Sequence, residues 1–246
     1  MKNYLVGALR PVLDTWGPWK GAGPNENWQR DLDYYAEMYE LSRRTAGNFL
    51  AGEWETVVFR SAVLDVRQFC IAQWYAIKEL WHQEPCNILW MGSDTMFVRP
   101  TEIFGMYDKM KMFNYTDPRS IADIPHYFND DVRYYPATMD PEVWNVGERL
   151  MRQWHDHVEV KWDLGQMIHN YQYWSQPMDA NAVFDPRLNW LAHGIRAITP
   201  ENIAQHEEWN RCPLNQAKIV HFSGSRGGDA AVKIMRDFVK YLNLDI

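Results

Sequence analysis

Asp94 stands in a polar turn that directly follows an apolar run. The run covers residues 87–91, and the turn consists of Gly92, Ser93 and Asp94. A short apolar run that ends at glycine predicts a covered strand, and ligands of open α/β sheets lie beyond the carboxyl ends of such strands. A carboxylate there suits a hard divalent cation, which in turn can grip phosphate oxygens. An aspartate in a turn can also serve only to bond the nearby backbone, so Asp94 alone leaves both interpretations open.

A second candidate group follows the predicted strand 217–222. His221 lies near the end of that strand, and Gly224 and Arg226 lie in the small, basic turn after it. Neutral imidazole is a good ligand for Mn²⁺ or similar ions, and glycine lets backbone N–H groups approach a phosphate. The Arg226 guanidinium can hold a diphosphate through two parallel hydrogen bonds. The alternative is a core histidine followed by a loop that starts the next helix.

The order of these motifs resembles that of GT-A glycosyltransferases. In that family Asp-any-Asp follows the metal-binding strand, and here Gly92 replaces the first Asp while Asp94 keeps the second. The His-Phe-any-Gly run at 221–224 is similar to the C-terminal motif of glycogenin-like, family-8-type retaining enzymes, although Arg226 comes one position early and no Pro-Trp follows. The resemblance implies Mn²⁺ or Mg²⁺ held by Asp94 and His221, with Arg226 on the leaving diphosphate, and it favours retention at the anomeric carbon.

The resemblance also implies contacts with the sugar and the nucleotide. An Asn-rich turn, here residues 129–131, precedes a helix that bears Asp163 and Gln166. These two residues are three apart and share a helix face, so their side chains could accept hydrogen bonds from sugar hydroxyls. A helix N-cap at Asp163, with Gln166 reaching back to it, explains the same pair equally well. The donor contacts that the resemblance implies are Tyr4, Val6, Arg67, Ser93, Gly224 and Arg226.

The elements that must position these groups alternate between strands and helices. Strands are predicted over 4–9, 55–59, 87–94, 109–115, 127–134, 196–199 and 217–222. Helices are predicted over 26–44, ending before Gly47, and over 67–81, 100–104, 141–155, 163–173 and 228–242. This alternation predicts an α/β fold, and with the resemblance it implies a single GT-A-like domain over residues 1–246. A mixed, twisted sheet would lie between helices, with a Rossmann-like nucleotide-binding half.

Composition excludes several classes of protein. Of the 246 residues 46% are hydrophobic and 23% charged, which is typical of a globular protein with a real core. A net charge of −7 argues against tight nonspecific binding to nucleic acid. No apolar run has the length of a membrane span, and the three cysteines have no metal spacing, which fits a reducing cytosol. We therefore expect a cytoplasmic protein without a transmembrane segment.

Taken together, the sequence predicts a metal-dependent glycosyltransferase that moves a sugar from a nucleotide-diphosphate donor. The acceptor is left open and could be a glycan, a lipid-linked sugar, a protein or a modified base; the oligomeric state is open as well. One alternative is an inactive GT-A-like binding module, for which Gly92 in place of the first Asp is the best argument. A nucleotidyltransferase is less favoured, because no Gly-rich basic loop follows the first predicted strand.

Overall fold

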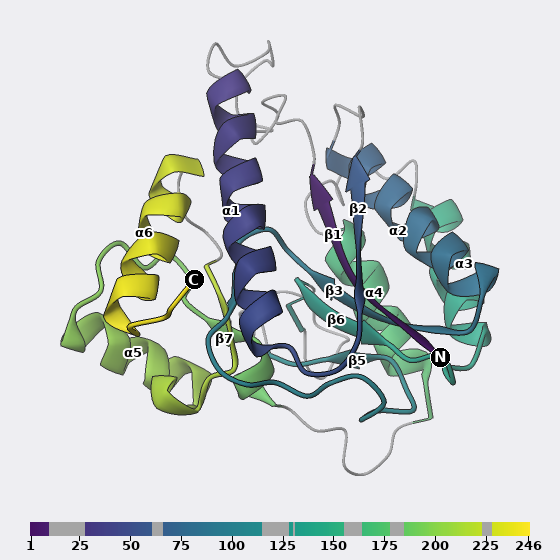
Figure 1. Cartoon of the computed structure of the whole chain (residues 1–246). Helices are drawn as coiled ribbons and strands as arrows, with labels where there is room; N and C mark the ends of the chain where they lie inside the picture. The colour runs from purple at the N-terminus through teal and green to yellow at the C-terminus, as the bar shows by residue number, and fades with distance from the viewer. Residues whose placement is uncertain are drawn as a thin grey trace.

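The computed structural model describes residues 1–9, 28–60, 66–114, 128–129, 131–154, 164–177, 185–222 and 228–246. Strands and helices are interspersed along these segments, and helices lie on both sides of a mixed sheet (Figure 1). The predicted α/β class with a mixed sheet between helices is therefore confirmed.

The larger sheet has five strands among the described residues, in the order β2-β1-β3-β6-β5. Their bounds are β1 Lys2–Leu9, β2 Glu55–Arg60, β3 Cys86–Met91, β5 Lys111–Met112 and β6 Val132–Tyr135. β1 is parallel to β2 and to β3, whereas β6 is antiparallel to both of its neighbours, β3 and β5. Because β6 runs the other way, its amino end lies beside the carboxyl end of β3, where Met91 pairs with Val132.

Both faces of this sheet are covered. Successive side chains of a strand point to opposite faces, and the residues of β1 and β3 divide accordingly between two buried clusters. One cluster contains Tyr4, Val6, Ile88 and Trp90, and the other contains Leu5, Leu89 and Met91. A strand that is buried on both faces reads as a continuous apolar run, which is the pattern that 87–91 shows.

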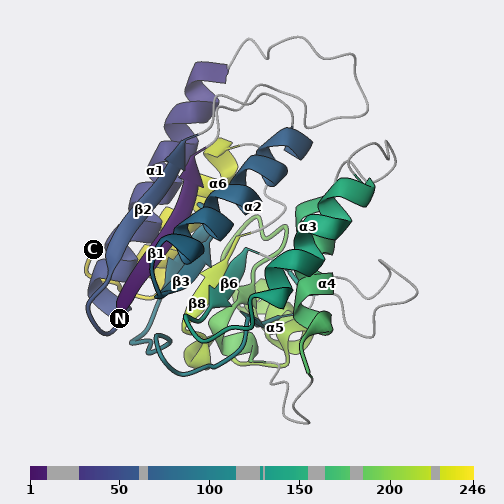
Figure 2. The same ribbon diagram turned by 90° about the vertical axis from the view of Figure 1, so that its right-hand side faces the viewer.

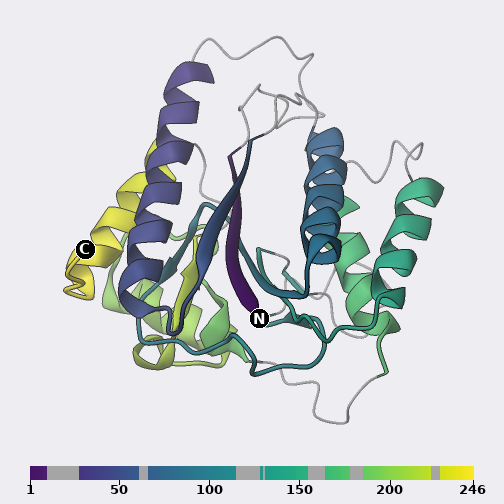
Figure 3. The same cartoon turned by 45° about the vertical axis from the view of Figure 1, so that its right-hand side comes forward.

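Helices from different parts of the chain cover the two faces. α2 (Val66–Gln83), α3 (Glu142–Trp154) and α4 (Leu164–Ser175) lie on one side, and α1 (Trp28–Phe49) lies on the other (Figures 1 and 3). Figure 2 looks onto the side that carries α2, α3 and α4. Trp74, Trp144 and Ile168 pack from these three helices against the sheet, whereas Ala46 packs from α1. None of the helices in the described segments has the length and apolar character needed to cross a membrane.

A smaller sheet carries the C-terminal part of the chain. Its strands are β4 (Thr95–Phe97), β8 (Ile219–His221) and β7 (Trp190–Leu191), in that order. β8 is antiparallel to β4 and parallel to β7. α5 (Pro200–Asn210) and α6 (Gly228–Tyr241) join α1 around a third cluster that includes Met38, Trp190, Val220 and Phe238. Two short 3₁₀ turns, Pro186–Leu188 and Leu214–Gln216, flank these strands.

Residues 100–104 are not the predicted helix. Thr101 forms a parallel bridge with Leu50, and its backbone N–H donates to the Phe49 carbonyl at 2.7 Å. α1 also continues through Gly47 to Phe49, so Gly47 does not end it. The buried residues Ala46 and Leu50 anchor this last turn in the core, and pairing with that turn holds residue 101 extended despite the helix-favouring Pro100.

Residues 196–199 are not the predicted strand. Thr199 is instead the N-cap of α5, where its side chain accepts a hydrogen bond from the Asn202 backbone N–H, and Pro200 occupies the first turn. The β-branched pair Ile198 and Thr199 favours a strand by propensity. A capping threonine followed by proline is a typical helix start, and here the helix start prevails over the strand propensity. The strands predicted over 109–115 and 127–134 are present but shorter, as β5 and β6.

Candidate metal centre

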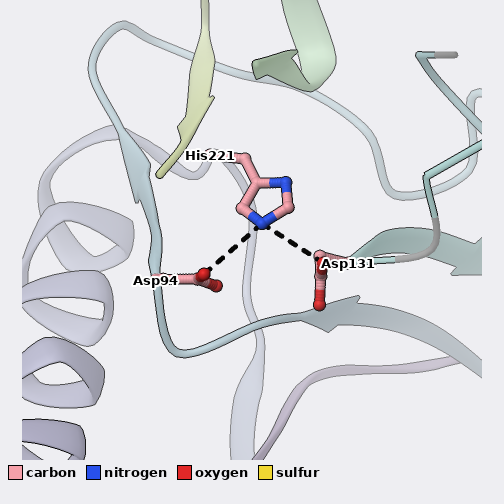
Figure 4. Close-up of side chains that lie close together, drawn as sticks. All are labelled: Asp94, Asp131 and His221. Atoms are coloured by element: carbon pink, nitrogen blue, oxygen red, sulfur yellow. Dashed lines mark ion pairs between the residues drawn. The ribbon is translucent and has the colours of Figure 1, made fainter. Parts of the chain in front are cut away.

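Two carboxylates and one imidazole converge where the two sheets meet. The His221 Nε2 atom lies 3.2 Å from Asp131 Oδ2 and 3.5 Å from Asp94 Oδ2 (Figure 4). One ligand atom from each residue lies within 4.8 Å of the others. The His221 side chain is fully buried, whereas the side chains of Asp94 and Asp131 are 29% and 38% exposed. The carboxylates therefore form the accessible side of the cluster and the imidazole forms its inner side.

The alternation of β8 aims His221 at this place. Ile219 packs in the same buried cluster as Leu89 and Met91 of the larger sheet, whereas Val220 packs on the opposite face, toward α5 and α6. The two-residue period of a strand gives His221 the same direction as Ile219. Thr95 pairs with His221 in register, and the Ala192 backbone N–H donates to the His221 carbonyl at 2.8 Å. His221 is thus held on both sides by neighbouring strands.

Asp94 is fixed by a tight turn between β3 and β4. The Thr95 hydroxyl and backbone N–H both donate to the Gly92 carbonyl, at 2.7 Å and 3.3 Å. The Asp94 carbonyl in turn accepts the Phe222 backbone N–H at 2.9 Å. The turn that the sequence predicted after β3 is therefore present, and it brings Asp94 beside the end of β8.

Asp131 enters the cluster from the start of β6. Its carbonyl accepts the Gly92 backbone N–H at 2.8 Å, which extends the β3–β6 ladder by one step. Its backbone N–H donates to Asn129 Oδ1 at 3.1 Å, and its Oδ2 atom accepts from Asn129 Nδ2 at 3.3 Å. Backbone and side chain are therefore both fixed by immediate neighbours.

The spacing of the three side chains suits one divalent cation. Adjacent ligands of an octahedral ion with bonds of about 2.1 Å lie about 3.0 Å apart, and opposite ligands about 4.2 Å apart. The distances of 3.2 Å and 3.5 Å from Nε2 to the two carboxylates are close to the first value. Carboxylate oxygens with one imidazole nitrogen form a donor set suited to Mn²⁺, and Mg²⁺ favours the carboxylates.

Of the other predicted residues, four can be placed: Ser93 and Gln166, and Tyr4 and Val6 of β1. Ser93 lies in the turn beside Asp94, and Gln166 lies half-buried in the first turn of α4, where its carbonyl accepts a hydrogen bond from the Asn170 side chain. Asn170 also holds the Phe128 backbone, with its amide donating to the Phe128 carbonyl and accepting from the Phe128 N–H. α4 is thereby tied to the segment that leads to Asp131.

Tyr4 and Val6, the predicted donor contacts on β1, are buried in the cluster under α2 and α3. The Tyr4 hydroxyl donates to Glu84 at 2.7 Å, near the amino end of β3 and away from the turn that carries Asp94. The remaining predicted site residues lie outside the described residues: Asp163, Gly224 and Arg226 entirely, and Arg67 in its side chain. Their roles stay predictions.

Sequence reasoning did not include Asp131 among the metal ligands. The sequence placed Asp131 in an Asn-rich turn next to a predicted strand, as it did the other candidates, but gave no reason to pair that turn with Gly92. The absence of a carboxylate at position 92 is the feature that indicates Asp131. If the site lacks one ligand there, an acidic residue at a neighbouring strand end is the candidate to replace it.

Comparisons with known proteins bear on the fold. No protein-family model and no curated protein sequence matches this chain. A solved structure described as a glycosyltransferase involved in the glycosylation of the major capsid of PBCV-1 matches 96% of this chain and 100% of its own, with a TM-score of 0.56 and 12% identity. The chain has a glycosyltransferase fold. The galactosyltransferase LgtC, solved in complex with donor and acceptor sugar analogs, matches 99% of this chain and 97% of its own, with a TM-score of 0.46 and 11% identity.

The glycosyltransferase fold confirms the GT-A-like architecture that the sequence motifs implied. At 12% identity the likeness concerns the arrangement of the elements. The function of this chain therefore has to be inferred from its own side chains, above all from the cluster of Asp94, Asp131 and His221.

Proposed function

We propose that this protein is a metal-dependent glycosyltransferase that uses a nucleotide-diphosphate sugar as donor. The observation that carries the proposal is the cluster of Asp94, Asp131 and His221 at the end of β3, within a glycosyltransferase fold. Ligands of open α/β sheets bind beyond such strand ends. The match to a glycosyltransferase over nearly the whole chain also supports a single catalytic domain over residues 1–246.

The two strand-end residues would hold the cation. Asp94, fixed by its turn, and His221, fixed between β4 and β7, would hold Mn²⁺ or Mg²⁺ for the donor diphosphate. When bound, such a cation neutralises the negative charge that builds on the leaving diphosphate. Because His221 is fully buried, its imidazole cannot turn out to solvent, so the same nitrogen would always face the cation.

The predicted residues around the cluster would bind and orient the substrates. Arg226 would form two hydrogen bonds with the diphosphate, and the backbone at Gly224 would approach the same group. Asp163 and Gln166 would accept hydrogen bonds from hydroxyls of donor or acceptor sugars. Ser93 lies beside Asp94 and would contact the donor near the cation. The His-Phe-any-Gly run at 221–224 is the reason for which we propose that transfer retains the configuration at the anomeric carbon.

The first experiment measures donor binding. Calorimetric titration of the full chain with a panel of nucleoside diphosphates, with Mn²⁺ and then with excess EDTA, should show at least one ligand whose affinity falls more than tenfold in EDTA. Asp94→Asn should abolish this metal-dependent gain and leave the circular dichroism spectrum unchanged. Equal affinities of every binding ligand in Mn²⁺ and EDTA would refute the metal role.

The second experiment separates the proposal from its two alternatives. A glycosyltransferase should slowly hydrolyse its sugar donor in Mn²⁺ and release a nucleoside diphosphate, even without the acceptor. An inactive binding module, which Gly92 in the place of the first Asp favours, would bind the same donor and leave it intact. A nucleotidyltransferase would instead join a sugar phosphate to the nucleotide of a nucleoside triphosphate and release pyrophosphate.

A further inference from the structure

We infer that Asp131 supplies the carboxylate that Gly92 lacks, so that this chain completes its metal centre with a ligand taken from the neighbouring strand. The inference rests on the proposed function and adds to it a third protein ligand and a reason for the glycine. On this inference the carboxylate missing from position 92 is replaced by that of Asp131, so the departure from the Asp-any-Asp pattern moves a ligand to another position and does not remove it.

The space beside Gly92 is the first argument. A Cβ atom placed on Gly92 would lie 2.9 Å from Asp131 Oδ1, 3.2 Å from Asp131 Cβ and 3.0 Å from Asp94 Oδ1. The Asp131 carboxylate therefore occupies the volume that a side chain at position 92 would need. Any larger residue at 92 would force the Asp131 carboxylate to shift from its present position, so we expect room for a carboxylate at one of the two positions and not at both.

The support behind Asp131 is the second argument. Asn129 binds both the backbone and the carboxylate of Asp131, and its Oδ1 atom accepts a hydrogen bond from Asn189 Nδ2 at 3.0 Å. The Asn189 carbonyl accepts from Asn114 Nδ2, which also donates to Asn210 of α5. All four asparagines are buried. A buried chain of hydrogen-bonded amides is costly to rearrange, so it holds Asp131 in one position.

The geometry around His221 is the third argument. Its Nε2 atom faces Asp131 Oδ2 and Asp94 Oδ2 at similar distances, although Asp94 comes from the turn after β3 and Asp131 from the residue before β6. An imidazole nitrogen offers one hydrogen atom or one lone pair, and neither can serve two carboxylates equally well. A cation among the three atoms is attracted by both carboxylates and accepts the nitrogen lone pair.

The decisive measurement is the affinity of the full chain for Mn²⁺ alone, read from the electron paramagnetic resonance signal of the free ion. Asp131→Asn keeps the size of the side chain and an oxygen for Asn129, yet removes the charge. It should weaken Mn²⁺ binding at least as much as the loss of an outer-shell partner, which is about 10–100-fold. Asp237→Asn is the matched control. Asp237 is a partly exposed carboxylate on α6 whose ion pair among the described residues is with surface Lys233, and the substitution should leave the affinity unchanged.

An exchange of positions tests the role of Gly92. Asp131→Gly should lose Mn²⁺ affinity as Asp131→Asn does, and the double variant Gly92→Asp/Asp131→Gly should recover at least tenfold of that loss. Gly92→Asp alone should weaken binding, because its new side chain collides with Asp131. Melting temperatures of all variants show which of them are folded, and only folded variants are compared.

The outcomes separate the inference from the proposed function. If Asp94→Asn loses Mn²⁺ and Asp131→Asn binds as tightly as the wild type, Asp131 is an ion-pair partner of His221 and the inference is overturned, while the metal-dependent function stands. Failure of the double variant to recover affinity would also overturn the exchange. If the wild-type chain binds no Mn²⁺ with or without a nucleoside diphosphate, both the inference and the metal-dependent function are overturned.

Discussion

Single amide side chains hold much of the backbone around the candidate site. Asn170 on α4 is fully buried, and its side chain donates to the Phe128 carbonyl at 2.8 Å while accepting from the Phe128 N–H at 2.7 Å. A short segment with no helix or strand of its own is thereby bonded as firmly as a strand residue. The same kind of contact, from Asn129, holds Asp131.

At this scale we expect Asn170→Ala to destabilise the fold. The substitution leaves the N–H and the carbonyl of Phe128 without these partners, and each buried polar group left unpaired costs about 1–3 kcal/mol. Urea denaturation followed by circular dichroism measures the change in the free energy of unfolding. Asn145→Ala is the control, since Asn145 is exposed and its side chain bonds, within the described part of the chain, to Glu142 on its own helix. Its effect should stay within about 0.5 kcal/mol. Equal midpoints for the two variants would contradict this account.

Among the elements, α3 and α4 approach each other closely at Gly147. A Cβ atom there would lie 2.6 Å from Gln172 Nε2 and 2.6 Å from Trp74 Cζ2. Neither neighbour can yield easily, because Gln172 donates to the Val143 carbonyl and accepts from the Trp74 indole N–H. Gly147 thus lets three helices, α2, α3 and α4, share one buried contact.

Two glycines within helices, Gly147 in α3 and Gly47 in α1, should respond to alanine in opposite ways. Gly147→Ala overfills the contact, which costs about 1–3 kcal/mol and outweighs the gain of about 1 kcal/mol in helix propensity. Gly47→Ala has no atom within 4 Å of the new Cβ, so it should stabilise the fold by about 0.5–1 kcal/mol. Differential scanning calorimetry of both variants beside the wild type gives the sign of each change. A rise in melting temperature for Gly147→Ala would contradict this account, because it would show that the helices move apart to admit the methyl group at little cost in free energy.

For the whole molecule, buried histidines link stability to pH. Burial lowers the pKa of His169 well below its usual value, and the positive charge of Arg133 lowers it further. Burial also lowers the pKa of His206. Below about pH 6.5 the unfolded chain takes up protons at these positions and the folded chain does not. The unfolded state then binds more protons, so stability falls as the pH is lowered.

We therefore expect the free energy of unfolding to decrease from pH 7 to pH 5, with His169 and His206 each contributing a slope of up to about 1.4 kcal/mol per pH unit. His169→Gln should make the decrease shallower by up to that amount. His82→Gln, a change at an exposed position, should leave the slope as it is. Urea titrations at half-unit steps of pH provide the comparison. An unchanged slope in His169→Gln would mean that His169 takes up its proton at the same pH in the folded and unfolded states.

The sequence by itself determined the parts of this protein that depend on local patterns. The apolar run 87–91, followed by a small polar turn, located β3 and Asp94, and the run before His221 located β8. The α/β class followed from the alternation of such runs with helical ones, and the family resemblance gave the glycosyltransferase fold. The predictions for residues 100–104 and 196–199 were wrong because other interactions opposed the local preferences. Residues 100–104 pair with the end of α1, and residues 196–199 end in the N-cap of α5.

Only the tertiary structure decided that Asp131 belongs beside Asp94 and His221. The pairing of β6 with β3 joins residues about forty positions apart, and its antiparallel direction alone puts the start of β6 against the end of β3. A local pattern specifies which way a strand's side chains alternate, but it does not specify which other strand lies beside it. The need for glycine at position 92 arises from that neighbour's carboxylate, so it becomes visible only when the two strands are seen side by side.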